Sequence, residues 1–148
     1  MDNIVYEFLM KPRRILTQIR RAEAQLEGLR LSLYPSAIRY DTDKVMSSPS
    51  DPMPQYAVRV DEIQDQLKKL RLEYINAQDD ICTATLRMSQ IEQEVIMLRY
   101  VAHYSWRRII HETGKSEATV FRAHRRAQKY LKKYLDNLEV TVKDSKPE

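Results

Sequence analysis

The scarcity of glycine restricts the folds open to this chain more than any other feature of its sequence. Gly28 and Gly114 are the only glycines among 148 residues. β-Sandwiches, dinucleotide-binding units and P-loop enzymes use several glycines in tight turns and phosphate-binding loops. Four of the six prolines lie between residues 35 and 54, which indicates one long loop between long helices. The sequence therefore predicts an all-α fold.

Two segments place apolar residues at alternating steps of three and four, the spacing of a heptad seam. The first covers residues 12–34, and we expect Pro12 at its first helical position, where a missing N–H costs nothing. Ahead of it, residues 4–10 are expected to form a separate short turn of helix capped by Asp2. The second segment covers residues 56–88 and would be a helix about 50 Å long.

We expect these helices to form an antiparallel, coiled-coil-like hairpin over residues 1–88. The loop 35–54 that joins them is either an ordered strap or a linker. Because the second helix is longer than the first, part of its seam needs another cover. The N-terminal residues Ile4, Tyr6, Phe8 and Leu9, the C-terminal domain or a second copy of the chain would each provide one. The last possibility predicts a homodimer, which Ile81→Asp should split.

The charge of the chain is concentrated near its C-terminal end. Residues 99–134 hold ten Lys or Arg side chains against Glu112 and Glu117, a net charge of +8 in a chain whose total is +4. Such a block favours a polyanionic partner, and nucleic acid is the usual one. The alternative is a solvated helix surface on a helical adaptor protein that does not bind DNA.

Capping signals divide this basic region into short helices. Ser89 and Glu92 have the spacing of a capping box, which predicts a new helix over residues 90–101 rather than one helix running straight on from residue 56. Ser105 is a suitable N-cap for a helix over residues 106–113.

A glycine and a second cap then complete a helix-turn-helix. Gly114 suits the left-handed position after a helix, and Ser116 suits the N-cap of a basic helix over residues 117–138. We therefore expect a DNA-binding domain at 89–138 that folds on its own, followed by a polar tail at 139–148. Its core would combine residues 91–110 with an apolar stripe on the last helix. That stripe comprises Val120, Ala123, Ala127, Leu131, Tyr134 and Leu138.

The opposite side of the last helix carries the side chains expected to contact DNA. A recognition helix places its N-terminal residues near base edges in the major groove, and an arginine there can bind guanine O6 and N7 together. The predicted base-reading residues are Ala118, Thr119 and Arg122. Six further residues are better placed for phosphate contacts, namely Arg107, Arg108, Ser116, Arg125, Arg126 and Lys129.

The turn region also carries short motifs at defined spacings. Residues 106–110 (WRRII) match a Leu-x-x-Ile-(Ala/Gly) helix, with Ile110 in place of the usual small residue, and Ser116, Val120 and Ala127 match the recognition helix that follows. In these features residues 91–138 resemble region 4 of sigma factors. The promoter-melting region of sigma factors has no counterpart here, so the resemblance does not imply a complete sigma factor.

Nearly the whole chain is similar to a family of small phage- and prophage-encoded transcriptional regulators. The matching motifs are Tyr-x-x-x-Lys-Val at residues 40–45, Leu-Arg-Tyr at 98–100, and Phe-Arg-Ala-His at 121–124, where Tyr is commoner than Phe121. The resemblance implies a helical hairpin followed by a sigma-like helix-turn-helix. It also implies activation of late or packaging-region phage genes on double-stranded DNA, contact with host RNA polymerase, and a location in the bacterial cytoplasm.

Other chemistry has little support in the sequence. Cys82 is the only cysteine, so an internal disulfide is excluded and a reducing compartment is expected. The three histidines, His103, His111 and His124, lack cysteine or close acidic partners, so we expect core or phosphate-side positions for them and no metal site. Adjacent acidic pairs on a helix point in different directions, so we expect no enzyme activity and no cofactor. No run approaches the roughly 18 apolar residues of a membrane span. The main alternative within DNA binding is a phage DNA-packaging subunit of the small-terminase type.

Overall fold

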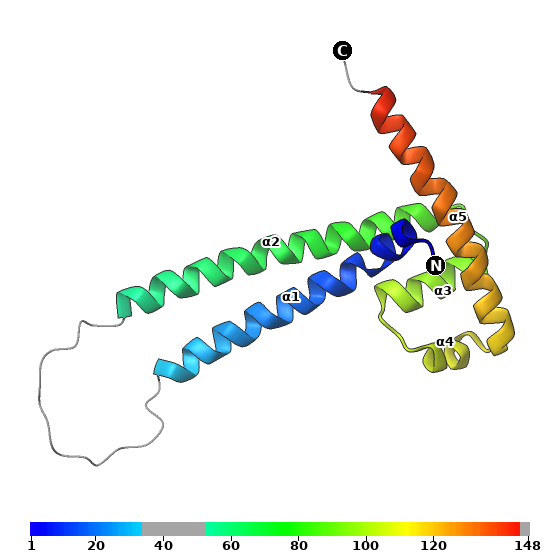
Figure 1. Ribbon diagram of the computed structural model, residues 1–148. Helices are drawn as coiled ribbons and strands as arrows, with labels where there is room; N and C mark the ends of the chain where they lie inside the picture. The colour runs from blue at the N-terminus through cyan, green and yellow to red at the C-terminus, as the bar shows by residue number, and fades with distance from the viewer. Residues whose placement is uncertain (34–52, 146–148) are drawn as a thin grey trace, which may run out of the picture. The chain divides into compact units, whose positions relative to one another are not determined.

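The computed structural model describes residues 1–33 and 53–145, and this part of the chain is helical without any strand (Figure 1). The predicted all-α class is confirmed. The two long helices are α1 (Asn3–Leu33) and α2 (Met53–Thr85). They are followed by α3 (Gln90–Ile96), the π-helical segment η1 (Met97–Val101), α4 (Trp106–Thr113) and α5 (Glu117–Asp144). The motif at residues 40–45 and most of the expected loop 35–54 lie outside the described residues.

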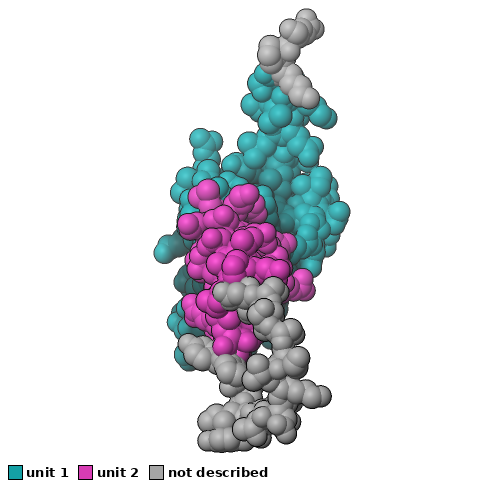
Figure 2. Space-filling model, turned by 90° about the vertical axis from the view of Figure 1, so that its left-hand side faces the viewer, with its two compact units in different colours: residues 1–14, 74–148 teal, residues 15–73 magenta. Residues whose placement is uncertain are grey.

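The chain divides into two compact units (Figure 2). Unit 1 comprises residues 1–14 and 74–148, and unit 2 comprises residues 15–73. This division differs from the expected boundaries after residues 88 and 138. Residues 1–14 and 74–88, the two ends of the expected first domain, belong to the same unit as the basic helices.

In unit 2, segments of α1 and α2 bury the heptad residues that the sequence singled out. Ile15, Ile19 and Ala22 of α1 are buried, as are Ile63, Leu67 and Leu70 of α2. Outside this apolar strip, Arg71 and Glu23 form an exposed ion pair with 3.4 Å between Nη2 and Oε1. Exposed pairs contribute little, so burial of the apolar strip is the main stabilisation of this unit.

Unit 1 has a core built from three parts of the chain. Val5 and Leu9 of α1 meet Ile81 and Ala84 of α2, all with exposed fractions of 1% or less. The same cluster includes Met88, Ile96, Tyr100, Ala127 and Leu131. The N-terminal segment and the C-terminal helices therefore cover the end of the second heptad seam within one chain.

This burial removes the reason for expecting a homodimer through the second seam. Ile81 is wholly buried in the core of unit 1, so no bare stripe is left there for a second copy. Leu9 and Phe8 pack against this core as proposed, but Ile4 and Tyr6 are exposed and Val5 occupies the inner position instead. The expectation that residues 90–138 fold alone also loses its basis, since they share this core with Val5, Leu9 and Ile81.

The start of α1 differs from the expected one. The expected helix start at Pro12 and the separate turn over residues 4–10 are wrong, because α1 runs without a break from Asn3. Pro12 lies inside the helix, where it cannot donate a backbone hydrogen bond, and its ring is fully buried. Asp2 does cap the helix, since its Oδ1 accepts from the N–H of Ile4 at 3.0 Å.

A turn at residues 86–89 separates α2 from α3, so the alternative of one continuous helix is wrong. Ser89 has the extended backbone of an N-cap but its side chain makes no capping bond, so the predicted capping box does not form. The expected helix 90–101 changes type after Ile96. The N–H of Ala102 donates to the carbonyl of Met97 at 2.9 Å, a π-type bond.

The caps around the turn between α4 and α5 are confirmed. Ser105 Oγ accepts from the Arg108 N–H at 3.2 Å, and Ser116 Oγ accepts from the Thr119 N–H at 3.2 Å. Gly114 has φ +62°, the left-handed conformation expected after α4. α5 continues to Asp144, so the expected helix end at residue 138 is wrong.

We expect Ser116→Ala to destabilise unit 1 by about 1 kcal/mol, because the variant leaves a first-turn N–H of α5 without its cap. Urea unfolding followed by circular dichroism measures this difference. Ser116→Asn, which retains a capping oxygen, should remain close to the wild type. Equal losses for the two variants would show that the cap is not the source of the effect.

Candidate nucleic-acid interface

The predicted DNA-contacting cations lie on an exposed face of α5. Arg122, Arg126 and Lys129 follow one another at helical spacings of four and three, Arg125 lies beside them, and all four are exposed. Within the described part of the chain, none of the four forms an ion pair or a hydrogen bond through its side chain. Their charges are therefore free to meet an external anion.

The first turn of α5 holds the smaller predicted contacts. Ala118 is exposed, whereas Thr119 is half-buried and its Oγ1 lies 2.8 Å from Ser116 Oγ. The hydroxyls of Ser116 and Thr119 are thus occupied with each other and with the cap. Among the predicted base-reading residues, Arg122 has the side chain with unused donors.

The two arginines of α4 differ in their surroundings. Arg107 is exposed and has no ion pair within the described residues. Arg108 lies over the ring of Tyr104, 3.6 Å from its centroid, and its Nε is 3.7 Å from Glu112 Oε1. Arg108 therefore already has two partners, and it is a weaker candidate for a phosphate contact than Arg107.

Arg99, which belongs to the basic block but is not among the predicted DNA contacts, holds the turn region together. Its Nη1 donates to the carbonyl of Tyr104 at 2.9 Å, and its guanidinium lies 4.8 Å from the ring of Trp106. Trp106 in turn contacts the ring of Phe121 on α5. The π-helical segment is thus tied to both helices around the turn.

His124 takes the core position of the two that the sequence left open for the histidines, and it lies buried behind the basic face. His124 Nε2 lies 2.7 Å from the Tyr100 hydroxyl, and its Nδ1 lies 3.1 Å from Gln128 Nε2. Trp106 packs edge-on against the imidazole at 4.7 Å. His124 neighbours Ala123 on the apolar stripe of α5, and this position was the signal for burial that the sequence offered.

Burial and positive neighbours change the acidity of this pair. Burial, followed by the charges of Arg99 and Arg125, lowers the pKa of His124 to about 4. Burial also raises the pKa of Tyr100 to about 12, although the charge of Arg99 opposes this. At neutral pH the imidazole and the phenol are therefore both uncharged, and they act as a positioning contact between η1 and α5.

Within the described residues, no group of three or more His, Cys, Asp or Glu side chains comes together as a metal site. His103 is instead paired with Tyr74, whose hydroxyl lies 2.9 Å from Nε2. Burial and the charge of Asp79 raise the pKa of the Cys82 thiol, which disfavours a reactive thiolate.

None of the described helices contains an apolar stretch long enough to cross a bilayer.

Comparisons of the chain with protein-family models, with curated proteins and with solved structures find no match.

Proposed function

We propose that this chain is a sequence-specific transcription regulator that binds double-stranded DNA with α5 in the major groove. The observation that supports this proposal most directly is the set of four exposed cations on α5 that have no partner in the described part of the chain, next to a turn whose two helices are both capped. A rigid, capped helix that presents unpaired donors is suited to entering a groove.

The side chains of α5 suggest a division of roles. Arg122 would bind guanine O6 and N7, with Ala118 and Thr119 beside neighbouring bases. Arg107, Arg125, Arg126 and Lys129 would contact phosphates, while Ser116 and Arg108 mainly support the turn. In this proposal α4 and α5 act as a sigma region-4-like helix-turn-helix.

The biological setting of the proposal rests on the family resemblance. The chain would be phage-encoded, act in the bacterial cytoplasm and contact host RNA polymerase. Activation of transcription is the role that this family implies, and the contact with polymerase would be detected by co-purification of polymerase with the intact chain in the presence of target DNA.

Selection from a random duplex pool with the full chain, followed by sequencing, tests the proposal. A sequence-specific regulator should enrich a defined motif. Retention of DNA without any enriched motif, together with rings of many subunits in solution, would favour a packaging subunit. Failure to retain DNA would favour a helical adaptor.

Substitution of Arg122 should separate base reading from general affinity. On the selected site, Arg122→Ala is expected to cost about 1–3 kcal/mol of binding free energy, with a smaller loss on unrelated DNA, because a bidentate guanine contact is removed. Lys129→Ala serves as the matched comparison and should weaken binding to both DNAs similarly. Fluorescence anisotropy titrations measure both variants, and equal losses on both DNAs for Arg122→Ala would exclude it from base reading.

A further inference from the structure

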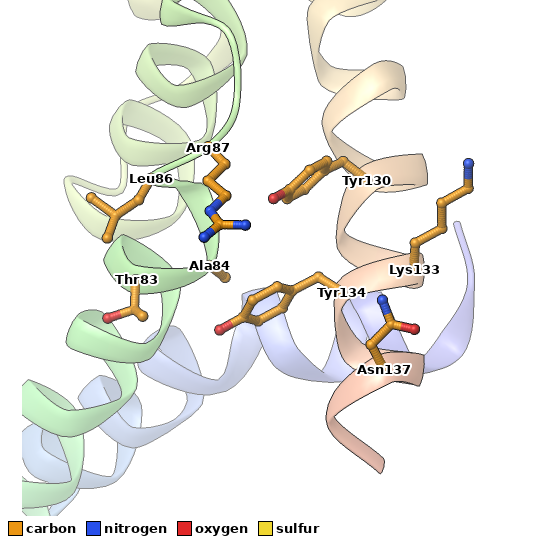
Figure 3. Close-up of a pocket in the computed structure, with 8 residues that line it drawn as sticks. All are labelled: Thr83, Ala84, Leu86, Arg87, Tyr130, Lys133, Tyr134 and Asn137. Carbon is orange, nitrogen blue, oxygen red and sulfur yellow. The ribbon is translucent and has the colours of Figure 1, made fainter. Parts of the chain in front are cut away.

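A second surface of unit 1 has features of a binding site that DNA binding does not use. A pocket of about 440 Å³ opens between the C-terminal end of α2 and the middle of α5 (Figure 3). Its volume lies in the range of small-molecule sites. Its lining residues are Thr83, Ala84, Leu86, Arg87, Tyr130, Lys133, Tyr134 and Asn137.

Polar side chains line this pocket on both sides. Figure 3 shows the Tyr130 and Tyr134 side chains extending from α5 toward α2, with the Arg87 guanidinium on the facing side. Within the described residues, none of these three side chains has a hydrogen-bond or ion-pair partner. In Figure 3 the Tyr130 hydroxyl points toward the Arg87 guanidinium, whereas the Tyr134 hydroxyl points to the side of Thr83 and Ala84. One phenol hydroxyl and a guanidinium are thus available to one acceptor.

The charge of the lining is of one sign. Arg87 and Lys133 are positive, and no Asp or Glu lines the pocket. A guanidinium binds a carboxylate through two parallel hydrogen bonds, and such charge-assisted bonds are about twice as strong as neutral ones. The polar end of the pocket therefore fits an oxyanion.

The rest of the lining is apolar. Its larger apolar groups are Ala84, Leu86 and the two tyrosine rings. The Leu86 side chain is 68% exposed, although it is large and apolar, and a ligand seated in the pocket would remove part of it from water. An inorganic anion would leave this apolar surface and most of the volume unused.

We propose that the pocket between α2 and α5 binds a small organic carboxylate whose body is aromatic or aliphatic. Arg87 binds the carboxylate, the hydroxyl of Tyr130 donates to it, and the apolar body lies against Leu86 and the tyrosine rings. The site lies within one unit and requires neither DNA nor a second chain.

Ligand titration of the full chain, followed by NMR in the absence of DNA, tests this proposal. The probes are phenylacetate, 4-phenylbutyrate and octanoate, with 4-phenylbutyramide as a neutral analogue and inorganic phosphate as an anion without an apolar body. We expect at least one carboxylate to shift the amide signals of residues 83–87 and 130–137 with saturation. The neutral amide and phosphate should each bind on the order of tenfold more weakly or not at all.

Variants then assign the contacts. Arg87→Gln should weaken carboxylate binding on the order of tenfold, and Tyr130→Phe should weaken it by a smaller factor while keeping the ring. Arg20→Gln, at an exposed arginine outside the lining, is the matched control and should bind as the wild type does.

Several results would overturn the proposal. They are saturable binding by none of the three carboxylates, equal binding of 4-phenylbutyrate and its amide, or unchanged affinity in both Arg87→Gln and Tyr130→Phe. Because no DNA is present, such a failure would leave the proposed DNA-binding function untouched.

Discussion

Ile81→Asp is expected to unfold unit 1 rather than to dissociate a dimer. Ile81 has an exposed fraction of 0% and packs in the core that joins α1, α2 and the C-terminal helices. A carboxylate at this position would be buried with no partner, and the structure would lose an isoleucine from a close-packed core. We expect a loss of about 4 kcal/mol or more, a large share of the stability of a small domain.

The same helix provides a matched control for this prediction. Ile75 also lies on α2 but is 53% exposed, so Ile75→Asp should change the unfolding free energy by about 0.5 kcal/mol or less. Urea unfolding of both variants, with light scattering to record the mass of the folded species, measures the two effects. A folded Ile81→Asp variant with half the mass of the wild type would contradict the burial described here and restore the dimer seam.

Acidification below pH 6.5 is expected to destabilise unit 1 through His124. Its pKa is lowered from 6.5 to about 4 by burial first and then by Arg99 and Arg125. Between these values the unfolded chain binds more protons than the folded chain, so a falling pH favours unfolding. The free energy of unfolding therefore keeps its full value at pH 7 and falls as the pH drops from 6.5 toward 4. The loss that His124 causes amounts to at most about 3 kcal/mol.

The contribution of His124 is obtained by difference, because carboxylates also titrate in this range. The wild type should lose more unfolding free energy between pH 7 and pH 4.5 than His124→Gln, which has no imidazole to protonate. His111→Gln, at an exposed histidine of α4, is the matched control and should keep the dependence of the wild type. Parallel pH profiles for the wild type and His124→Gln would contradict the buried, neutral imidazole.

The features that sequence predicted correctly depend on local chemistry. The caps at Ser105 and Ser116 and the left-handed Gly114 follow from side-chain preferences within a few residues. The apolar stripe of α5 is likewise a periodicity within one helix, although its last member, Leu138, is exposed. Such signals require no knowledge of distant parts of the chain.

The features that sequence missed depend on tertiary packing. Pro12 usually marks a helix start, but here a fully buried ring stabilises it inside α1. The N-terminal segment shares a core with residues more than 70 positions away, such as Ile81, and no local pattern specifies this pairing. The sequence therefore identifies the apolar heptad seam, but it does not show which residues cover that seam.

In the candidate interface, too, some features follow from local sequence and others depend on tertiary packing. The exposure of Arg122, Arg125, Arg126 and Lys129 follows from their place opposite the apolar stripe, and the sequence assigned all four. The engagement of Arg99 with Trp106, and of Arg108 with Tyr104, depends on how η1, the following turn and α4 fold together. Counting basic residues alone therefore overstates the number of cations available to DNA.

The salt dependence of DNA affinity tests most directly whether the exposed cations bind a nucleic acid. If Arg107, Arg125, Arg126 and Lys129 contact phosphates, the slope of log affinity against log salt for the full chain should be about −3 to −4. Affinity for a duplex should then fall roughly a hundredfold between about 50 and about 200 mM salt. Arg126→Ala should reduce the magnitude of the slope by about one. An affinity that stays constant over this range, or no binding at the lowest salt, would contradict the proposed interface.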